Sequence, residues 1–177
     1  MFTKILAPID GRSPAREGLE IACALADGFG AKLVLLAVAD PARGAAPAAD
    51  YAEGVARPAS YTAFVRRLPI DPALDAAEDP AAALYAQRFA ADLAEGVARD
   101  ARAFAEAQHV PEVLAIVRAG DPAEKILEVA RAEAVDLIVL STAGRRGLSR
   151  FVHPSVAETV QRRAGCQTLV LHPPGAG

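Results

Sequence analysis

The residues best suited to binding chemistry form a loop near the end of the chain. Positions 141–154 hold small residues, Gly144 and a pair of adjacent arginines, and they are followed by Ser155 and, three residues on, Glu158. Serine followed by glutamate at that spacing is typical of a capping box at a helix N-terminus. Backbone N–H groups in a glycine-bearing loop beside a helix N-terminus bind anions, phosphate above all. The stretch therefore predicts a phosphate-binding loop.

Catalytic and metal-binding patterns find little support. The sequence lacks the G-x-x-x-x-G-K-[ST] phosphate loop and the G-x-S-x-G nucleophile elbow. The histidines show no metal-ligand spacing to cysteines or carboxylates; they are His109, His153 and His172. Cys23 and Cys166 are far apart, and we expect buried thiols. The sequence favours a binding protein over an enzyme, with no catalytic residue and no metal site.

Asp10 follows the first apolar run and has two interpretations. An aspartate in that position often simply turns the chain after a strand. A carboxylate at the end of a central parallel strand also lies where open α/β sheets bind ligands. There it could accept a hydrogen bond from a ribose hydroxyl or a base amine.

Alternating apolar runs and amphipathic segments predict the fold. Short apolar runs typical of strands buried on both faces lie at 3–9, 31–39, 113–117, 137–140 and 168–171. Helical spacing of apolar residues indicates helices at 13–27, 82–108, 121–134 and 155–164. Asp121 as N-cap, Pro122 at the first helical position and Glu124 closing a capping box agree on one helix start. The alternation predicts a doubly wound, Rossmann-like α/β fold with a five-stranded parallel sheet and helices on both faces.

The size and charge of the chain narrow its class. A chain of 177 residues can form one domain, here 1–177, with a long insertion. The net charge of −3 gives no electrostatic case for nucleic acid or an anionic membrane. No stretch approaches the ~18 consecutive apolar residues that a membrane span needs, and no signal-peptide pattern is present. We therefore expect a cytoplasmic protein that binds neither nucleic acid nor membrane.

The stretch at about 40–83 is far longer than a usual connection in an α/β fold. It is rich in proline, alanine and aspartate, a composition that favours a surface excursion without a core. Tyr51, Tyr61, Phe64 and the pair Arg66-Arg67 offer a second interpretation, a flap over a site or a surface for a protein partner.

Several segments in order resemble the universal stress protein family. They are Ile5-Leu-Ala-Pro-Ile-Asp-Gly, Leu33 to Val38, Gly120-Asp-Pro-Ala-Glu-Lys-Ile, Asp136-Leu-Ile-Val, Ser155-Val-Ala-Glu-Thr-Val and Cys166-Gln-Thr-Leu-Val-Leu. The resemblance implies a five-stranded parallel α/β fold and a homodimer paired through the last strand, here Thr168–Leu171. It also implies ATP or AMP binding, with Mg²⁺, in those members that keep the motif G-x-x-G-x₉-G-[S/T].

This chain departs from that motif. Ser141 stands at the first glycine, Gly144 matches the second, and Pro154 replaces the third ahead of a matching Ser155. If the first position needs a positive φ, serine there costs about 1–2 kcal/mol. Proline at 154 removes a backbone N–H, and a hydrogen bond from it to phosphate would be worth about 1.5–3 kcal/mol.

The resemblance assigns the nucleotide site residue by residue. The base side would be formed by Pro8, Asp10 and Val38, and the phosphate side by Ser141, Thr142, Gly144, Arg145, Arg146, Ser155 and Val156. Arg150 adds a third cation that could grip phosphate. Two functions stay open: an ATP or AMP sensor whose nucleotide orders the loop, or a nucleotide-independent regulatory homodimer with the insertion as partner surface. The altered motif positions favour the second.

Overall fold

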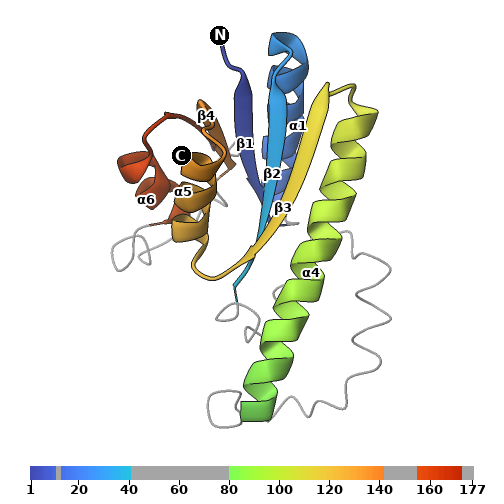
Figure 1. The fold of residues 1–177 in the computed structure, drawn as a ribbon, viewed down its shortest axis with the longest axis vertical. Coiled ribbons are helices and arrows are strands. Elements are labelled where there is room, and N and C mark those ends of the chain that lie inside the picture. Colours follow the sequence, from blue (N-terminus) through green and yellow to red (C-terminus); the bar gives the residue numbers. More distant parts are fainter. Residues whose placement is uncertain (11–12, 41–79, 142–154, 173–177) are drawn as a thin grey trace.

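The computed structural model describes residues 1–10, 13–40, 80–141 and 155–172. Within them the five apolar runs form strands β1 (Lys4–Ile9), β2 (Lys32–Ala39), β3 (Glu112–Ala119), β4 (Leu137–Ser141) and β5 (Gln167–Leu171). All pair in parallel, in the order β3-β2-β1-β4-β5. The predicted five-stranded parallel sheet is confirmed (Figure 1).

The strand order places β1 at the centre of the sheet. The chain first moves outward from β1 to β2 and β3, then returns to the other side of β1 with β4 and β5. Right-handed crossovers therefore send the early and late helices to opposite faces. Open α/β sheets bind ligands at such a reversal, beyond the strand ends that we call the carboxyl edge.

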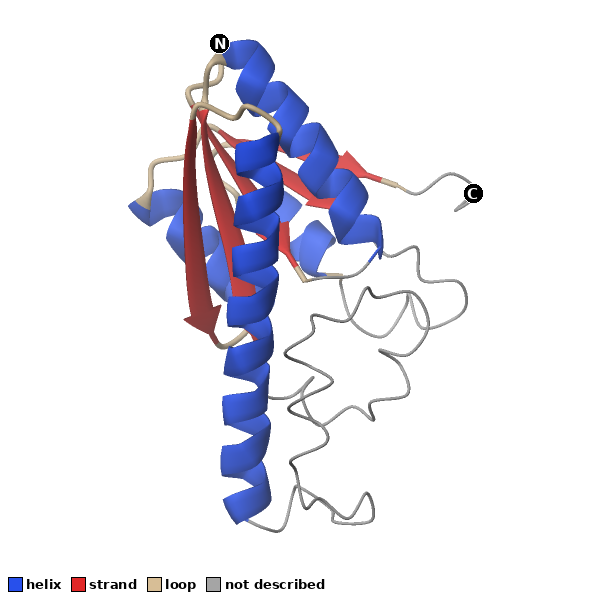
Figure 2. Ribbon diagram, turned by 90° about the vertical axis from the view of Figure 1, so that its right-hand side faces the viewer, coloured by secondary structure: helices blue, strands red, loops and turns tan. Residues whose placement is uncertain are grey.

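Within the described ranges, four helices lie between the strands. Helices α1 (Ser13–Phe29) and α4 (Pro80–Ala107) pack on one face, whereas α5 (Pro122–Ala132) and α6 (Val156–Arg163) pack on the other. We call these the α1–α4 face and the α5–α6 face. Figure 2 shows α1 and α4 lying together on one side of the strands. The predicted helices are confirmed, with boundaries shifted by a few residues.

Strand residues divide between the two faces by alternation. In β1, Ile5 and Ala7 join the core under α1 and α4, while Leu6 joins the core under α5 and α6. In β4, Val139 belongs to the first core and Leu140 to the second. This parity decides which way each residue at the carboxyl edge points.

Alanines form the buried stripe of the long helix α4. Their spacing of three or four residues keeps them on one side of the helix, and they are Ala90, Ala94, Ala98, Ala101 and Ala105. Small side chains let the helix approach the sheet closely, which fits a chain with only 5% aromatic residues. Leu84, in the first turns of α4, is 67% exposed.

The expectations for the cysteines and for membrane spans can be compared with the structure. Both cysteines are free: Cys23 is buried, and burial raises its pKa to about 11, whereas Cys166 is only half-buried. None of the helices in the described ranges is long and apolar enough to cross a membrane. The insertion lies almost wholly in 41–79, outside the described residues.

Candidate functional site

The residues expected to hold the base come together at the carboxyl edge. Pro8 lies next to the last residue of β1, Asp10 follows that strand, and Val38 is the penultimate residue of β2. Pro8 pairs with Leu36 and Ile9 with Ala37 in the β1–β2 register, so Asp10 and Val38 are level with each other two residues beyond Pro8 and Leu36. Val38 is half-buried and packs against the core on the α5–α6 face. Pro8 shares that face with Leu6 by alternation.

Ser141 ends β4 at the same edge, but its side chain points to the opposite face of the sheet. A methyl group added at Gly18 of α1 would lie 3.2 Å from both Cβ and Oγ of Ser141. The serine side chain is therefore directed at α1, on the α1–α4 face. A glycine-to-serine change at this position places the added atoms away from Pro8 and Val38.

The backbone at Ser141 also lacks the strain considered from the sequence. Among the described non-glycine residues, positive φ occurs at His109 and Ala134, and Ser141 is an ordinary strand residue. The expected penalty of about 1–2 kcal/mol for a left-handed serine does not arise. Glycine at a strand end does not by itself require a positive φ, so a serine can replace it at position 141 without backbone strain.

The N-terminus of α6 has the predicted capping box. Ser155 Oγ accepts from the backbone N of Glu158 at 3.1 Å, and the Ser155 backbone N donates to Glu158 Oε2 at 3.0 Å. Val156 is the first helical residue. The glutamate carboxylate thus occupies part of the helix N-terminus, where a bound anion would otherwise gain from the helix dipole. A phosphate here would have to compete with Glu158.

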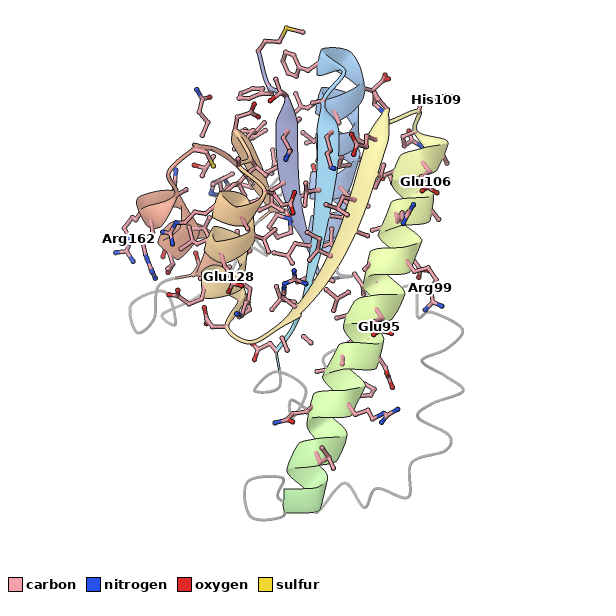
Figure 3. The ribbon with its side chains drawn as sticks, in the orientation of Figure 1. Glu95, Arg99, Glu106, His109, Glu128 and Arg162 are labelled. Carbon is pink, nitrogen blue, oxygen red and sulfur yellow. The ribbon has the colours of Figure 1, made fainter. Side chains whose placement is uncertain are left out.

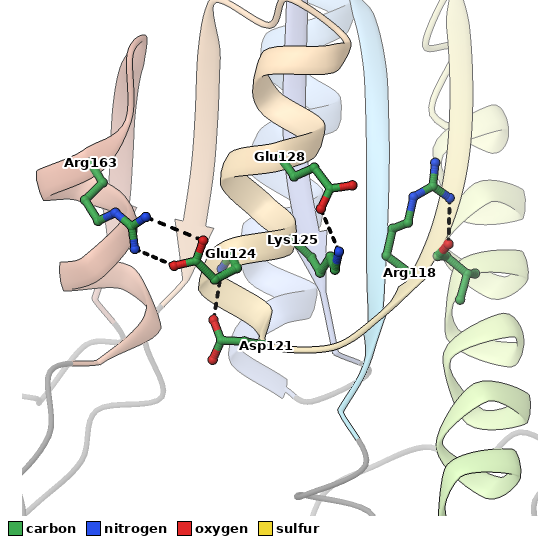
Figure 4. A network of polar contacts seen from close by, with 7 residues as sticks. Arg118, Asp121, Glu124, Lys125, Glu128 and Arg163 are labelled. Carbon is green, nitrogen blue, oxygen red and sulfur yellow. Dashed lines mark hydrogen bonds and ion pairs between the residues drawn. The ribbon is translucent and has the colours of Figure 1, made fainter.

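The start of α5 differs in one respect from the prediction. Asp121 is the N-cap, with Oδ1 accepting from the backbone N of Glu124 at 2.9 Å. The Glu124 carboxylate, however, binds Arg163 of α6 instead of closing a capping box (Figure 4). This hydrogen bond and the charge of Glu124 raise the pKa of Arg163. The Arg163 guanidinium, from another helix, therefore binds the carboxylate in place of the N-cap backbone N–H. The contact joins α6 to α5.

Gly120 shapes the loop between β3 and α5 at the carboxyl edge. Its φ of 132° is a conformation that side chains rarely adopt, and an added methyl group would lie 3.1 Å from Lys125 Cε. The Lys125 side chain therefore runs over the glycine before Nζ reaches Glu128 Oε2 at 2.6 Å. The loop needs glycine here for its backbone conformation.

Sequence reasoning missed Gly18. A glycine inside a helix costs about 1 kcal/mol relative to alanine, so its presence among the core-facing residues of α1 was a usable signal of close approach. The remaining predicted phosphate-side residues lie outside the described ranges: Thr142, Gly144, Arg145 and Arg146, together with Arg150 and Pro154. Their assignment stays a prediction.

Charged residues elsewhere do not assemble a metal centre. The described part of the chain contains no group of three potential ligands among His, Cys, Asp and Glu. Figure 3 shows Glu95, Arg99 and Glu106, all exposed, along α4, and Arg162 on α6 across the molecule. Among the described residues, Pro8, Val38 and Ser141 lie at neighbouring strand ends on the carboxyl edge.

Fold and site together define a doubly wound α/β protein with its candidate site at the point where the strand order reverses. The chain belongs to the universal stress protein family, whose family model matches residues 1–172. Over 50 residues, 28% of this chain and 29% of the relative, it is 44% identical to the universal stress protein MJ0531 of Methanocaldococcus jannaschii.

Solved structures agree in fold over nearly the whole length. The universal stress protein UspA from Lactobacillus plantarum superposes with a TM-score of 0.66 at 22% identity, covering 96% of this chain and 97% of that one. A universal stress protein in complex with cAMP gives 0.63 at 17% identity, with 97% of each chain covered. A family member from Arabidopsis thaliana with AMP bound gives 0.57 at 11% identity, covering 96% and 91%. At these identities the likeness establishes the fold.

Proposed function

We propose that this protein binds an adenine nucleotide at the carboxyl edge and acts by binding rather than catalysis. The observation that carries the proposal is the division of faces at that edge. Pro8 and Val38 share the α5–α6 face with the N-terminus of α6, whereas the Ser141 side chain turns to Gly18 on the other face. Ser141, whose replacement of a motif glycine disfavoured nucleotide binding on sequence grounds, therefore leaves the base side open.

Each part of the edge has a role in this proposal. Val38 and Pro8 offer apolar contacts to the base, and Asp10, exposed at the end of β1, accepts from a ribose hydroxyl or base amine. The N–H groups of Val156 and Ala157 remain as phosphate donors at the start of α6. The arginines of 141–154 would supply cations for the phosphates, and Mg²⁺ would accompany ATP. Solved members of the family carry cAMP or AMP, which supports this ligand class.

A nucleotide-independent function is the second candidate, and the capping box favours it. The Glu158 carboxylate already takes the Ser155 N–H at 3.0 Å and brings negative charge to the place where phosphate would bind. Pro154 supplies no N–H next to it. In this case the homodimer and the insertion would carry regulatory function without ligand.

Thermal unfolding with and without ATP, ADP, AMP and cAMP, each with and without Mg²⁺, separates the two candidates. A ligand at 100 times its Kd adds about 2.7 kcal/mol, which raises the Tm of a domain this size by roughly 5–11 °C. We expect Asp10→Ala to reduce the shift and Glu158→Gln to increase it, because glutamine keeps the cap without the charge. The absence of a shift for every nucleotide at millimolar concentration, in the wild type and in Glu158→Gln, would reject the nucleotide proposal.

We further propose a homodimer through the outer edge of β5. The Gln167 backbone N donates to Asp136 O at 3.2 Å, so Gln167 directs its N–H and C=O to β4. Successive residues of a strand turn these groups to alternate sides. Thr168 and Val170 therefore present theirs to the outside, and an antiparallel second copy can pair with them around Leu169. Half-buried apolar residues on this edge would gain from being covered.

A further inference from the structure

The second outer strand of the sheet, β3, has an edge of its own. It pairs with β2 over its whole length, from Lys32 opposite Glu112 to Ala39 opposite Ala119. No other described strand pairs with its outer side. The five residues from Val113 to Val117 are apolar and only half-buried. An eight-residue edge with such an apolar centre is a template for strand addition unless something protects it.

The backbone parity of this edge follows from one bond at its end. The Gly120 backbone N donates to Ala39 O at 3.0 Å, so Gly120 directs its hydrogen-bonding groups to β2. Because neighbouring residues alternate, the even-numbered residues of β3 also use β2. Val113, Ala115 and Val117 are left with N–H and C=O pointing outward.

The sequence of β3 has an internal two-fold pattern about Ala115. Val113 and Val117 are equivalent around this centre, and so are Leu114 and Ile116. The outermost positions carry opposite charges, Glu112 and Arg118, and both side chains are exposed. An antiparallel copy placed around Ala115 would therefore set each glutamate opposite the arginine of the other chain.

Face and backbone parity both agree with this register. In an antiparallel pair with its two-fold axis perpendicular to the sheet, each face continues into the same face of the copy. Leu114 and Ile116 both lie on the α5–α6 face, and Val113 and Val117 on the other. The residues that would exchange hydrogen bonds, 113 with 117 and 115 with itself, all have outward groups. A shift by one residue would lose this match.

The charges at the ends are available for such a contact. Lys32 Nζ binds Glu112 Oε1 at 2.6 Å and leaves 64% of the glutamate side chain exposed. Arg118 donates to the backbone O of its neighbour Val117 at 2.9 Å, a local contact with an uncharged acceptor (Figure 4). A partner's Glu112 would give the guanidinium a charged acceptor, and a hydrogen bond between charged groups is stronger than one to a neutral carbonyl.

We propose that the outer edge of β3 is an interface for a second copy of this chain, paired antiparallel around Ala115. Opposite charges directly across an antiparallel pair stabilise it and like charges destabilise it. The interface is isologous, so each charge pair occurs twice. It lies on the opposite edge of the sheet from β5, and it is independent of nucleotide binding. If both edges pair, copies join through alternate edges into assemblies larger than a dimer.

Charge reversal tests this interface. Sedimentation or light scattering over a wide concentration range measures the association of wild type, Arg118→Glu and Glu112→Arg. We expect each single variant to lose β3 association by at least about tenfold, because both pairs become like-charged. An equimolar mixture of the two variants regains it. In the mixed pair, the chain with two acidic strand ends faces the chain with two basic ones, so opposite charges meet at both positions.

Controls separate this interface from misfolding and from the β5 edge. Arg162→Glu reverses an exposed charge on α6, across the molecule from β3, and we expect wild-type association (Figure 3). The β3 variants are repeated in a Val170→Pro chain, where β5 pairing is blocked, and circular dichroism confirms folding. The interface is overturned if the Val170→Pro chain with an unaltered β3 stays monomeric at all concentrations, or if the mixture of single variants fails to regain association.

Discussion

At the scale of single residues, the pair Gly18 and Ser141 decides how the end of β4 is held. Alanine at 18 would gain about 1 kcal/mol of helix propensity. Its methyl group, however, would lie 3.2 Å from Ser141 Cβ, which is fixed by the strand and cannot rotate away. Overpacking of this kind costs about 1–3 kcal/mol, so the steric term is the larger of the two.

We therefore predict that Gly18→Ala lowers the free energy of unfolding by about 1 kcal/mol. In a Ser141→Gly background the same substitution becomes stabilising, because the obstructing atoms are gone. Urea unfolding of the four chains in a double-mutant cycle measures the coupling, expected at about 1–2 kcal/mol. Simple additivity of the two substitutions would show that the side chains do not meet.

Asp136 joins the first residues of the chain to β4. Its Oδ2 accepts from the Thr3 backbone N at 2.7 Å and from Thr3 Oγ1 at 2.8 Å, and Oδ1 accepts from the Lys4 backbone N at 3.2 Å. Burial tends to raise the pKa of this carboxyl, but the hydrogen bonds from Thr3 and Lys4 outweigh it and the pKa is lowered. The charged form is thus favoured in the folded chain.

A lowered pKa in the folded state gives stability that is present above the unfolded pKa, about 3.9, and is lost as the pH falls through the folded value. We predict that Asp136→Asn lowers the free energy of unfolding by about 1–2 kcal/mol at pH 7. The difference from wild type should shrink between pH 5 and pH 3. Chemical denaturation at each pH measures it, and a difference that stays constant to pH 3 would contradict the assigned role.

At the scale of elements, two helices end in the same hydrogen-bond pattern with different residues. After α1, Gly30 N donates to Asp27 O and Ala31 N to Ala26 O; after α5, Ala134 N donates to Arg131 O and Val135 N to Ala130 O. Gly30 has φ 64° and Ala134 has φ 50°. This is the Schellman motif, in which glycine is favoured because a left-handed residue with a side chain is strained.

We predict that Ala134→Gly raises the free energy of unfolding by about 1 kcal/mol and the Tm by roughly 2–4 °C. Gly30→Ala should change both in the opposite direction by a similar amount. Differential scanning calorimetry of the two single variants provides the comparison. Ala134 is exposed, and a methyl group added at Gly30 would meet nothing within 4 Å. The two substitutions therefore change backbone strain without changing side-chain packing.

At the scale of the whole molecule, both outer strands present apolar edges, and the β5 edge is the proposed dimer contact. We predict that Val170→Pro converts the β5 dimer to monomer, because proline removes an outward N–H next to Leu169, the centre of the pairing. Val170→Thr keeps that N–H and a β-branched shape and should remain dimeric. Light scattering coupled to size exclusion distinguishes them. An intact dimer in the folded proline variant, with Arg118→Glu also present, would reject the β5 contact.

The sequence by itself determined the elements and their class. Apolar runs and helical spacing depend on neighbours along the chain, so the strands, the helices and the α6 capping box could be predicted from local pattern. The grouping of the proposed base-side residues could also be predicted, because Pro8, Asp10 and Val38 lie at the ends of strands that a parallel sheet brings to one edge.

Only the tertiary structure decided what depends on neighbours in space. The Ser141 side chain points to Gly18, more than a hundred positions earlier in the chain, and therefore away from the face that holds Pro8 and Val38. Glu124 leaves its local cap for Arg163 of another helix. The outward N–H groups of β3 and β5 follow from which strand each one pairs with. Along any strand the backbone N–H and C=O groups alternate between its two sides. The strand that pairs with it decides which of these sides is left open.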